Sequence, residues 1–98
     1  MIVVYHPDAQ AELIESARFY ESRVNKLGSD FLNAVDDTVK LIAERPERGE
    51  IIQANIRCFT MSRFPYAIYY RISLDHVRIL AISHHSRHPD FWRNRLRE

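Results

Sequence analysis

The sequence has little of several residue types, and each shortage excludes a class of protein. Its single cysteine, Cys58, cannot form an internal disulfide, which predicts a reducing compartment and a cytoplasmic location. Two glycines and four prolines are too few for a loop-rich scaffold. No apolar run has membrane-spanning length, and Met1–Tyr5 lacks the basic start and cleavage site of a signal peptide. The 98 residues predict one domain, residues 1–98, which is too short for a dinucleotide-binding fold.

Charge is unevenly distributed along the chain, although the net charge is only +1. Residues 1–50 hold six basic and ten acidic side chains, a balance of −4. Residues 51–98 hold eight basic and three acidic side chains, a balance of +5, and all eight basic ones are arginines. We therefore expect anionic partners to bind the C-terminal half.

The first half of the sequence predicts a strand followed by two helices. A β-branched and aromatic run at residues 2–5 ends just before Pro7, which favours the first turn of a helix. Apolar residues then recur every three or four positions as far as Val24, which predicts an amphipathic helix. A second stripe of this kind, capped by Ser29, continues to Glu44, where the approach of a proline ends it.

The second half changes to a pattern rich in β-branched and aromatic residues. This pattern predicts three strands and a short closing helix, at Ile56–Met61, Tyr66–Ser73, Val77–His84 and Pro89–Arg97. A helical hairpin on one face of a mainly antiparallel sheet, with the N-terminal strand added to that sheet, is a two-layer α+β domain.

Alternation along the last two strands predicts which side chains share a face of the sheet. If Asp75-His76 is the turn, Tyr70 lies opposite Ala81 and Ala67 lies opposite His84. The face away from the helices is then open and presents a basic, aromatic surface, which consists of Tyr69, Arg71, Arg78 and His84, with Arg57 alongside.

Two segments of the second half resemble a known family. They are Arg63-Phe64-Pro65-Tyr66-Ala67-Ile68-Tyr69-Tyr70-Arg71 and His84-His85-Ser86-Arg87-His88-Pro89-Asp90-Phe91-Trp92. With the order strand, helix, helix, three strands, the chain resembles the RelE/ParE superfamily of bacterial toxins. The likeness runs from the opening strand and His6-Pro7-Asp8-Ala9 through Trp92 and covers nearly the whole chain. The resemblance implies the fold above. It also implies the toxin of a type II toxin–antitoxin (plasmid stabilisation) system, which inhibits growth until a cognate antitoxin neutralises it.

Proteins of this superfamily share one fold but have two different actions, RNA cleavage and binding to DNA gyrase. The residues of the site must therefore distinguish between the two. In members that resemble RelE and cut messenger RNA on the ribosome, the resemblance places cations near Cys58, Thr60, Ala67 and Arg87, and a tyrosine near Trp92. Only Arg87 matches that set, and RNA cleavage needs cations for the charge that develops on the phosphate. ParE-type members act on DNA gyrase without a nuclease site. We therefore expect a ParE-like protein that binds a macromolecular target and uses no cofactor.

Two alternatives stay open. The first is a ribosome-dependent mRNA endoribonuclease, because His84, His85 and Arg87 cluster at the end of a strand and histidine can transfer protons near neutral pH. The second is a domain that keeps the fold and antitoxin binding but has no toxicity. His84, His85 and His88 lack the spacing of a closed four-ligand zinc site, so we expect no metal.

For the target or the antitoxin we expect a surface of arginines and aromatic residues. Its predicted members are Arg57, Arg63, Tyr69, Arg71, Arg78, Arg87 and Trp92. An acidic, partly disordered antitoxin tail would fold on this surface, with its apolar side chains over Leu80 and Ile82. Trp92 is also expected to anchor the last helix by packing. The remaining basic residues of that helix are expected to form a solvated tail, and they are Arg93, Arg95 and Arg97.

Overall fold

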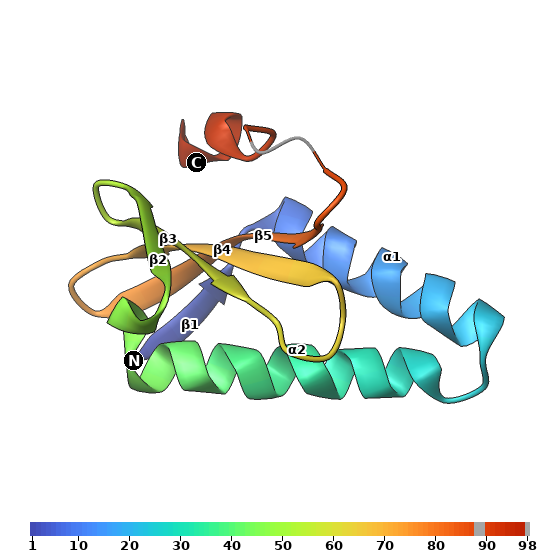
Figure 1. Ribbon diagram of the computed structural model, residues 1–98. Coiled ribbons are helices and arrows are strands. Elements are labelled where there is room, and N and C mark those ends of the chain that lie inside the picture. Colours follow the sequence, from blue (N-terminus) through green and yellow to red (C-terminus); the bar gives the residue numbers. More distant parts are fainter. Residues whose placement is uncertain (88–89, 98) are drawn as a thin grey trace.

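The computed structural model describes residues 1–87 and 90–97, without the side chain of Arg97, and has the predicted α+β architecture (Figure 1). The elements in chain order are β1 (Ile2–Tyr5), α1 (Pro7–Arg23), α2 (Leu27–Glu44), η1 (Pro46–Arg48), β2 (Glu50–Gln53), β3 (Ile56–Thr60), β4 (Tyr66–Ile72), β5 (His76–His84) and η2 (Arg93–Arg97). Within the described residues, the strands form one sheet in the order β1-β5-β4-β3-β2. Strand β1 is parallel to β5, and the other pairs are antiparallel.

Two elements differ from the prediction. The short strand β2 was not predicted, because its four residues are all exposed and show no buried-exposed alternation. The closing helix was predicted from Pro89, which lies outside the described residues, and the helical turns seen are a short 3₁₀ helix that starts at Arg93. No helix in the described ranges is long and apolar enough to cross a lipid bilayer.

The helical hairpin is held by contacts between its two helices as well as by local caps. Helix α1 begins as predicted, because the His6 Nδ1 atom accepts a hydrogen bond from the Asp8 backbone N–H at 3.0 Å. Helix α2 begins at Leu27 instead of Ser29. Its first N–H groups donate to the Glu21 carboxylate of α1, from Lys26 at 2.9 Å and from Gly28 at 3.0 Å. The start of α2 is therefore set by an acid from the preceding helix.

The main core lies between the hairpin and the sheet. Helix α2 contributes Phe31, Val35 and Ile42, each at most 1% exposed, at the spacing that the apolar stripe predicts. They pack against the helix-facing side chains of the sheet, which include Ile68, Tyr70, Val77, Ile79 and Ile82. This contact buries the central part of one face of the sheet.

The opposite face of the sheet is partly covered, which corrects the prediction of an open face. A second buried cluster there consists of Ile56, Leu80, Ala81 and Trp92. Trp92 is fully buried, so the C-terminal segment lies on the sheet, on the side away from α2 (Figure 1). The packing role expected for Trp92 is confirmed.

The predicted register of β4 and β5 is wrong. The Ser73 N–H donates to the His76 carbonyl at 2.9 Å, so the turn is Leu74-Asp75 instead of Asp75-His76. Tyr70 therefore pairs with Ile79. The next pair is Tyr69 with Ala81, so β5 has a bulge at this point. The sequence could not show this turn, because it contains a fully exposed leucine in place of a common turn residue.

The bulge changes which side chains of β5 share a face. Leu80 and Ala81 both belong to the second cluster, whereas Ile82 returns to the helix-facing core. His84 consequently pairs with Tyr66 instead of Ala67. Arg57 pairs with Tyr70 of β4, so it lies on the helix-facing side of the sheet and not beside the other arginines.

Candidate functional site

The face of the sheet away from the helices carries two arginines directly opposite each other. Arg71 of β4 and Arg78 of β5 form a cross-strand pair, and neither makes an ion pair with a described residue. One Arg71 nitrogen donates to the Leu96 carbonyl at 3.4 Å, while Arg78 Nε is buried without a hydrogen-bond partner. Like charges opposite each other on neighbouring strands repel. An anionic group bound here would relieve that repulsion.

Exposed apolar side chains lie next to this arginine pair. Strand β1 is parallel to β5, with Val4 paired to Arg78 and Ile2 paired to His76. Because paired residues point to the same side of a sheet, Ile2 and Val4 flank the arginines on this face. Their exposed fractions are 67% and 37%. We call these four residues, Ile2, Val4, Arg71 and Arg78, the arginine face.

The rest of this side of the sheet is covered by the C-terminal segment. The Trp92 ring stacks on Tyr69 with centroids 5.8 Å apart, and Leu80 beneath this segment is fully buried. Tyr69 is therefore half-buried instead of exposed. The expectation that an antitoxin covers Leu80 and Ile82 is wrong, since Trp92 covers the first and the second faces the helices.

A buried ion pair fixes the C-terminal segment to α1. Two Arg95 nitrogens donate to the two carboxylate oxygens of Glu12, each at 2.9 Å. Arg95 also donates to the Leu80 carbonyl at 2.8 Å and is 7% exposed, so it is not part of a solvated tail. Sequence reasoning missed this pair, because its partners lie 83 residues apart and neither has a local signal.

A hollow of about 390 Å³ lies at the end of the sheet where β4 begins and β5 ends. Its lining residues are Cys58, Thr60, Ala67, Tyr69, Ser83, His84, His85 and Arg87. The lining includes the three further positions to which the resemblance to RelE assigned cations, and they hold the uncharged residues Cys58, Thr60 and Ala67. Burial raises the pKa of the Cys58 thiol, against a smaller lowering effect of its hydrogen bond to Tyr69, so the thiol is protonated at neutral pH.

Two basic side chains of the hollow, Arg87 and His84, already interact with other residues of the chain. Arg87 forms an ion pair with Glu12 and lies 4.1 Å above the centre of the Phe91 ring. His84 Nδ1 accepts a hydrogen bond from the Ser86 backbone N–H at 3.1 Å, so the neutral imidazole carries its proton on Nε2. His84 can therefore donate a hydrogen bond to a ligand through Nε2–H. Its Nδ1 atom already accepts a hydrogen bond and is not available to take a proton from a substrate.

Two of the predicted binding residues lie elsewhere. Arg57 donates to the carbonyls of Glu47 at 3.0 Å and Gly49 at 2.8 Å, which holds the turn before β2. Arg63 pairs with Asp30 of α2 at 3.2 Å. The structure thus brings together Tyr69, Arg71, Arg78 and Trp92 and places Arg87 at the hollow. His88 lies outside the described residues, and within them no group of three His, Cys, Asp or Glu side chains could hold a metal ion.

Comparisons with known proteins agree with this architecture. The family model described as "ParE toxin of type II toxin-antitoxin system, parDE" matches residues 3–89. A solved structure titled "Chromosomal ParDE TA system from P. aeruginosa" superposes with a TM-score of 0.75 at 18% sequence identity, over 86% of this chain and 95% of that chain. At that identity the superposition establishes the fold alone. No curated protein sequence matches this chain.

Proposed function

This chain belongs to the ParE toxin family of type II toxin–antitoxin systems, and we propose that it arrests bacterial growth by binding a macromolecular target in the cytoplasm. DNA gyrase is the target that we propose, as for the ParE-type relatives. A cognate antitoxin holds the toxin inactive until it is removed.

The composition of the hollow favours binding over RNA cleavage. Three lining positions that carry cations in the RNA-cleaving relatives are uncharged here, and they are Cys58, Thr60 and Ala67. The cation that matches the RelE set, Arg87, is paired with Glu12. Attack of a 2′-hydroxyl on a phosphodiester needs positive charge placed at the phosphate, and a paired arginine supplies little of it.

The arginine face is the site that we propose for the antitoxin. Arg71 and Arg78 have no carboxylate partner among the described residues, and exposed Ile2 and Val4 lie beside them. An acidic segment with interspersed apolar residues fits both features, because its carboxylates can bind guanidinium groups bidentately while its apolar side chains cover β1. Such a segment would fold as it binds.

Induction of the chain in a bacterium tests this proposal. We expect growth arrest when the chain is expressed alone, and recovery when the neighbouring small reading frame, which would encode the antitoxin, is expressed with it. The purified chain should inhibit supercoiling by DNA gyrase. Growth without arrest would contradict the toxin function, whereas arrest with normal supercoiling would leave a toxin with a different target.

Ribosome-dependent mRNA cleavage is the second candidate function. The observation that favours it is the meeting of His84, His85 and Arg87 around one hollow. The Nε2–H group of His84 can donate a hydrogen bond to a phosphate or leaving oxygen held in the hollow. This candidate predicts new message ends after induction, which the target-binding function does not.

A further inference from the structure

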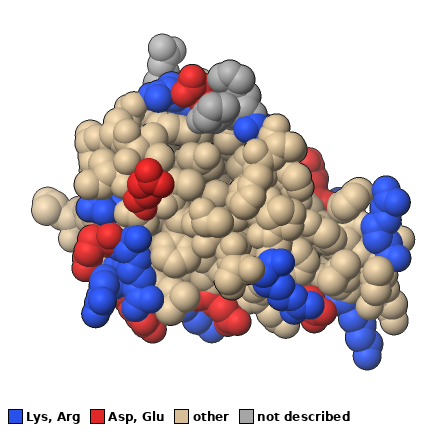
Figure 2. Space-filling view, viewed as in Figure 1, with Lys and Arg blue, Asp and Glu red and all other residues tan. Residues whose placement is uncertain are grey.

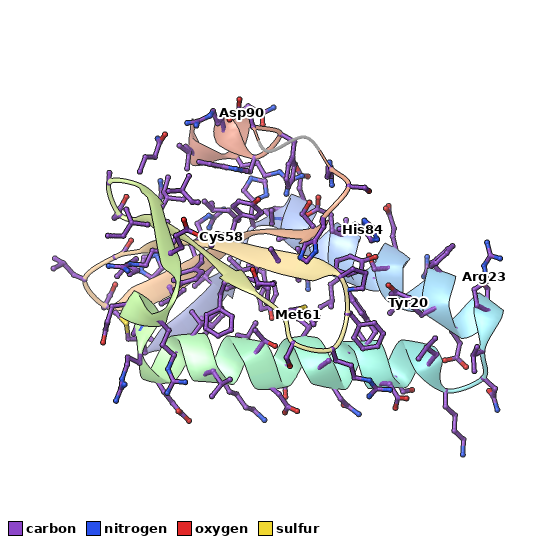
Figure 3. All side chains as sticks on the ribbon, viewed as in Figure 1. Tyr20, Arg23, Cys58, Met61, His84 and Asp90 are labelled. Carbon is purple, nitrogen blue, oxygen red and sulfur yellow. The ribbon has the colours of Figure 1, made fainter. Side chains whose placement is uncertain are left out.

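The end of the helical hairpin projects beyond the sheet. Helices α1 and α2 continue together past the strands, and the turn between them lies at one extreme of the molecule (Figure 1). Arg23 lies at this end of α1 and points away from the rest of the chain (Figure 3). We use the term hairpin tip for four residues of this end, Phe19, Arg23, Val24 and Lys26.

Hydrogen bonds and close helix packing hold the hairpin tip in place. Glu21 accepts hydrogen bonds from the first N–H groups of α2, which fixes the turn. Gly28 allows a close approach of the two helices, since a Cβ atom there would lie 2.5 Å from the Ala17 carbonyl oxygen. A rigid projection can enter a cleft with little loss of conformational entropy.

The hairpin tip also exposes apolar surface. Phe19 is 51% exposed and Val24 is 57% exposed. The Arg23 guanidinium lies 4.9 Å from the centre of the Phe19 ring, so the aromatic side chain is held beside a cation. Aromatic residues and arginine are the types most enriched at the energetic centres of protein interfaces.

The cations of this end have no ionic partner in the described part of the chain. Arg18, Arg23 and Lys26 form no ion pair there, and Glu21 is engaged by backbone N–H groups. Figure 2 shows Lys and Arg side chains gathered at this end of the molecule. The end of the hairpin is therefore basic, although residues 1–50 have a balance of −4.

We propose that the hairpin tip inserts into an apolar cleft with an acidic rim on the protein target of the toxin, which rests on the proposed target-binding function. In this complex Phe19 and Val24 of the toxin would enter the apolar cleft of the target. Arg23 and Lys26 would lie against acidic residues at the rim of that cleft, because opposite charges attract. A protein fits better than a nucleic acid, because the exposed centre is apolar and nucleic-acid interfaces are more polar and more strongly basic.

This surface is separate from the arginine face. The turn between β4 and β5, next to Arg71 and Arg78, lies at the opposite end of the molecule from the hairpin tip (Figure 1). The molecule extends 39 Å along its longest axis. Substitutions in the hairpin tip should therefore weaken target binding without weakening antitoxin binding.

A pair of matched double variants tests the proposal. Phe19→Ser with Arg23→Glu changes the hairpin tip, whereas Ile51→Ser with Arg45→Glu changes an exposed apolar and an exposed basic residue elsewhere. The cellular toxin concentration that halves the growth rate should rise at least about 10-fold for the tip variant only. Thermal unfolding and antitoxin affinity should stay unchanged in both variants.

Three other results would contradict the proposal, each in a different way. Full toxicity of the tip variant with an unchanged fold would overturn the hairpin tip as the target contact. A selective loss of affinity for a DNA duplex, measured by fluorescence anisotropy, would identify a nucleic-acid site and overturn the acidic protein cleft. Absence of arrest by the unmodified chain would overturn the proposed function and this inference with it.

Discussion

Glu12 and Arg95 form a buried ion pair that also completes the hydrogen bonding of β5 beyond the end of β1. The Ile82 N–H donates to Glu12 Oε1 at 3.2 Å, and the Leu80 carbonyl accepts from Arg95 at 2.8 Å. Pairing of β1 with β5 ends at Ile79, so these backbone groups lie on an edge that no strand of the described residues covers. The ion pair therefore joins α1, β5 and the C-terminal segment at one point.

Removal of Arg95 should destabilise the fold strongly. Arg95→Ala leaves the Leu80 carbonyl without its donor and the largely buried Glu12 carboxylate with Arg87 as its remaining cation, so we expect a loss on the order of 2–3 kcal/mol in the free energy of unfolding. Urea unfolding followed by the emission of Trp92, the single tryptophan of the chain, measures this loss. The native emission should also shift to the red if the C-terminal segment detaches.

Arg93→Ala is the matched control. Arg93 pairs with Asp90, and these side chains are 48% and 57% exposed, so we expect less than about 1 kcal/mol. Equal losses for the two variants would mean that the buried ion pair has no special role.

Gly28→Ala should destabilise the hairpin although alanine favours helices. The added Cβ would lie 2.5 Å from the Ala17 carbonyl oxygen, so the helices must separate at a cost of about 1–3 kcal/mol. Ser29→Ala should have little effect, because Glu21 and not Ser29 caps α2. A loss of about 1 kcal/mol for Ser29→Ala, typical of a removed cap, would contradict this assignment.

Stability should fall at alkaline pH. Burial is the main cause that raises the pKa of four tyrosines above the ordinary value of 10.0, and they are Tyr5, Tyr20, Tyr69 and Tyr70. A raised pKa means that the unfolded chain loses these protons first. The stabilisation is therefore complete below pH 10 and is lost as pH rises through the pKa values of the folded state. The urea midpoint should drop between about pH 8 and about pH 11, and an unchanged midpoint would contradict the prediction.

Antitoxin affinity should depend on the arginine face. Arg71→Ala and Arg78→Ala should each weaken the complex at least about 10-fold if these residues are central to the interface. Added salt should slow association of the unmodified chain, because opposite charges steer the encounter. Arg45→Ala is the control, since Arg45 is exposed and lies outside this face. Unchanged affinity in both arginine variants would place the antitoxin on another surface.

The helices and most strands could be predicted because burial leaves a periodic pattern in the sequence. The stripe that includes Phe31, Val35 and Ile42 indicated α2, and all three are buried. Strand β2 has no such pattern, since it is an exposed edge, and the turn at Leu74 has no turn signal. These two features depend on tertiary pairing and not on local preference.

The candidate site could be predicted only in part. Arg71 and Arg78 share a face as alternation requires, even though the predicted partners of their strands were wrong. The burial of Arg95 depends on Glu12, which is distant in sequence, and the face that Ile82 occupies depends on the bulge in β5. No local pattern encodes either relationship.

Mapping of message 5′ ends after induction tests the central claim, that this toxin binds a target and does not cleave RNA. Ribosome-bound RNA should be compared between the unmodified chain, His84→Ala and Arg87→Ala. The proposed function predicts growth arrest with intact messages and with no ends that depend on these side chains. New ends positioned by codon in the unmodified chain, and lost in both variants, would contradict it and establish the hollow as a ribonuclease site.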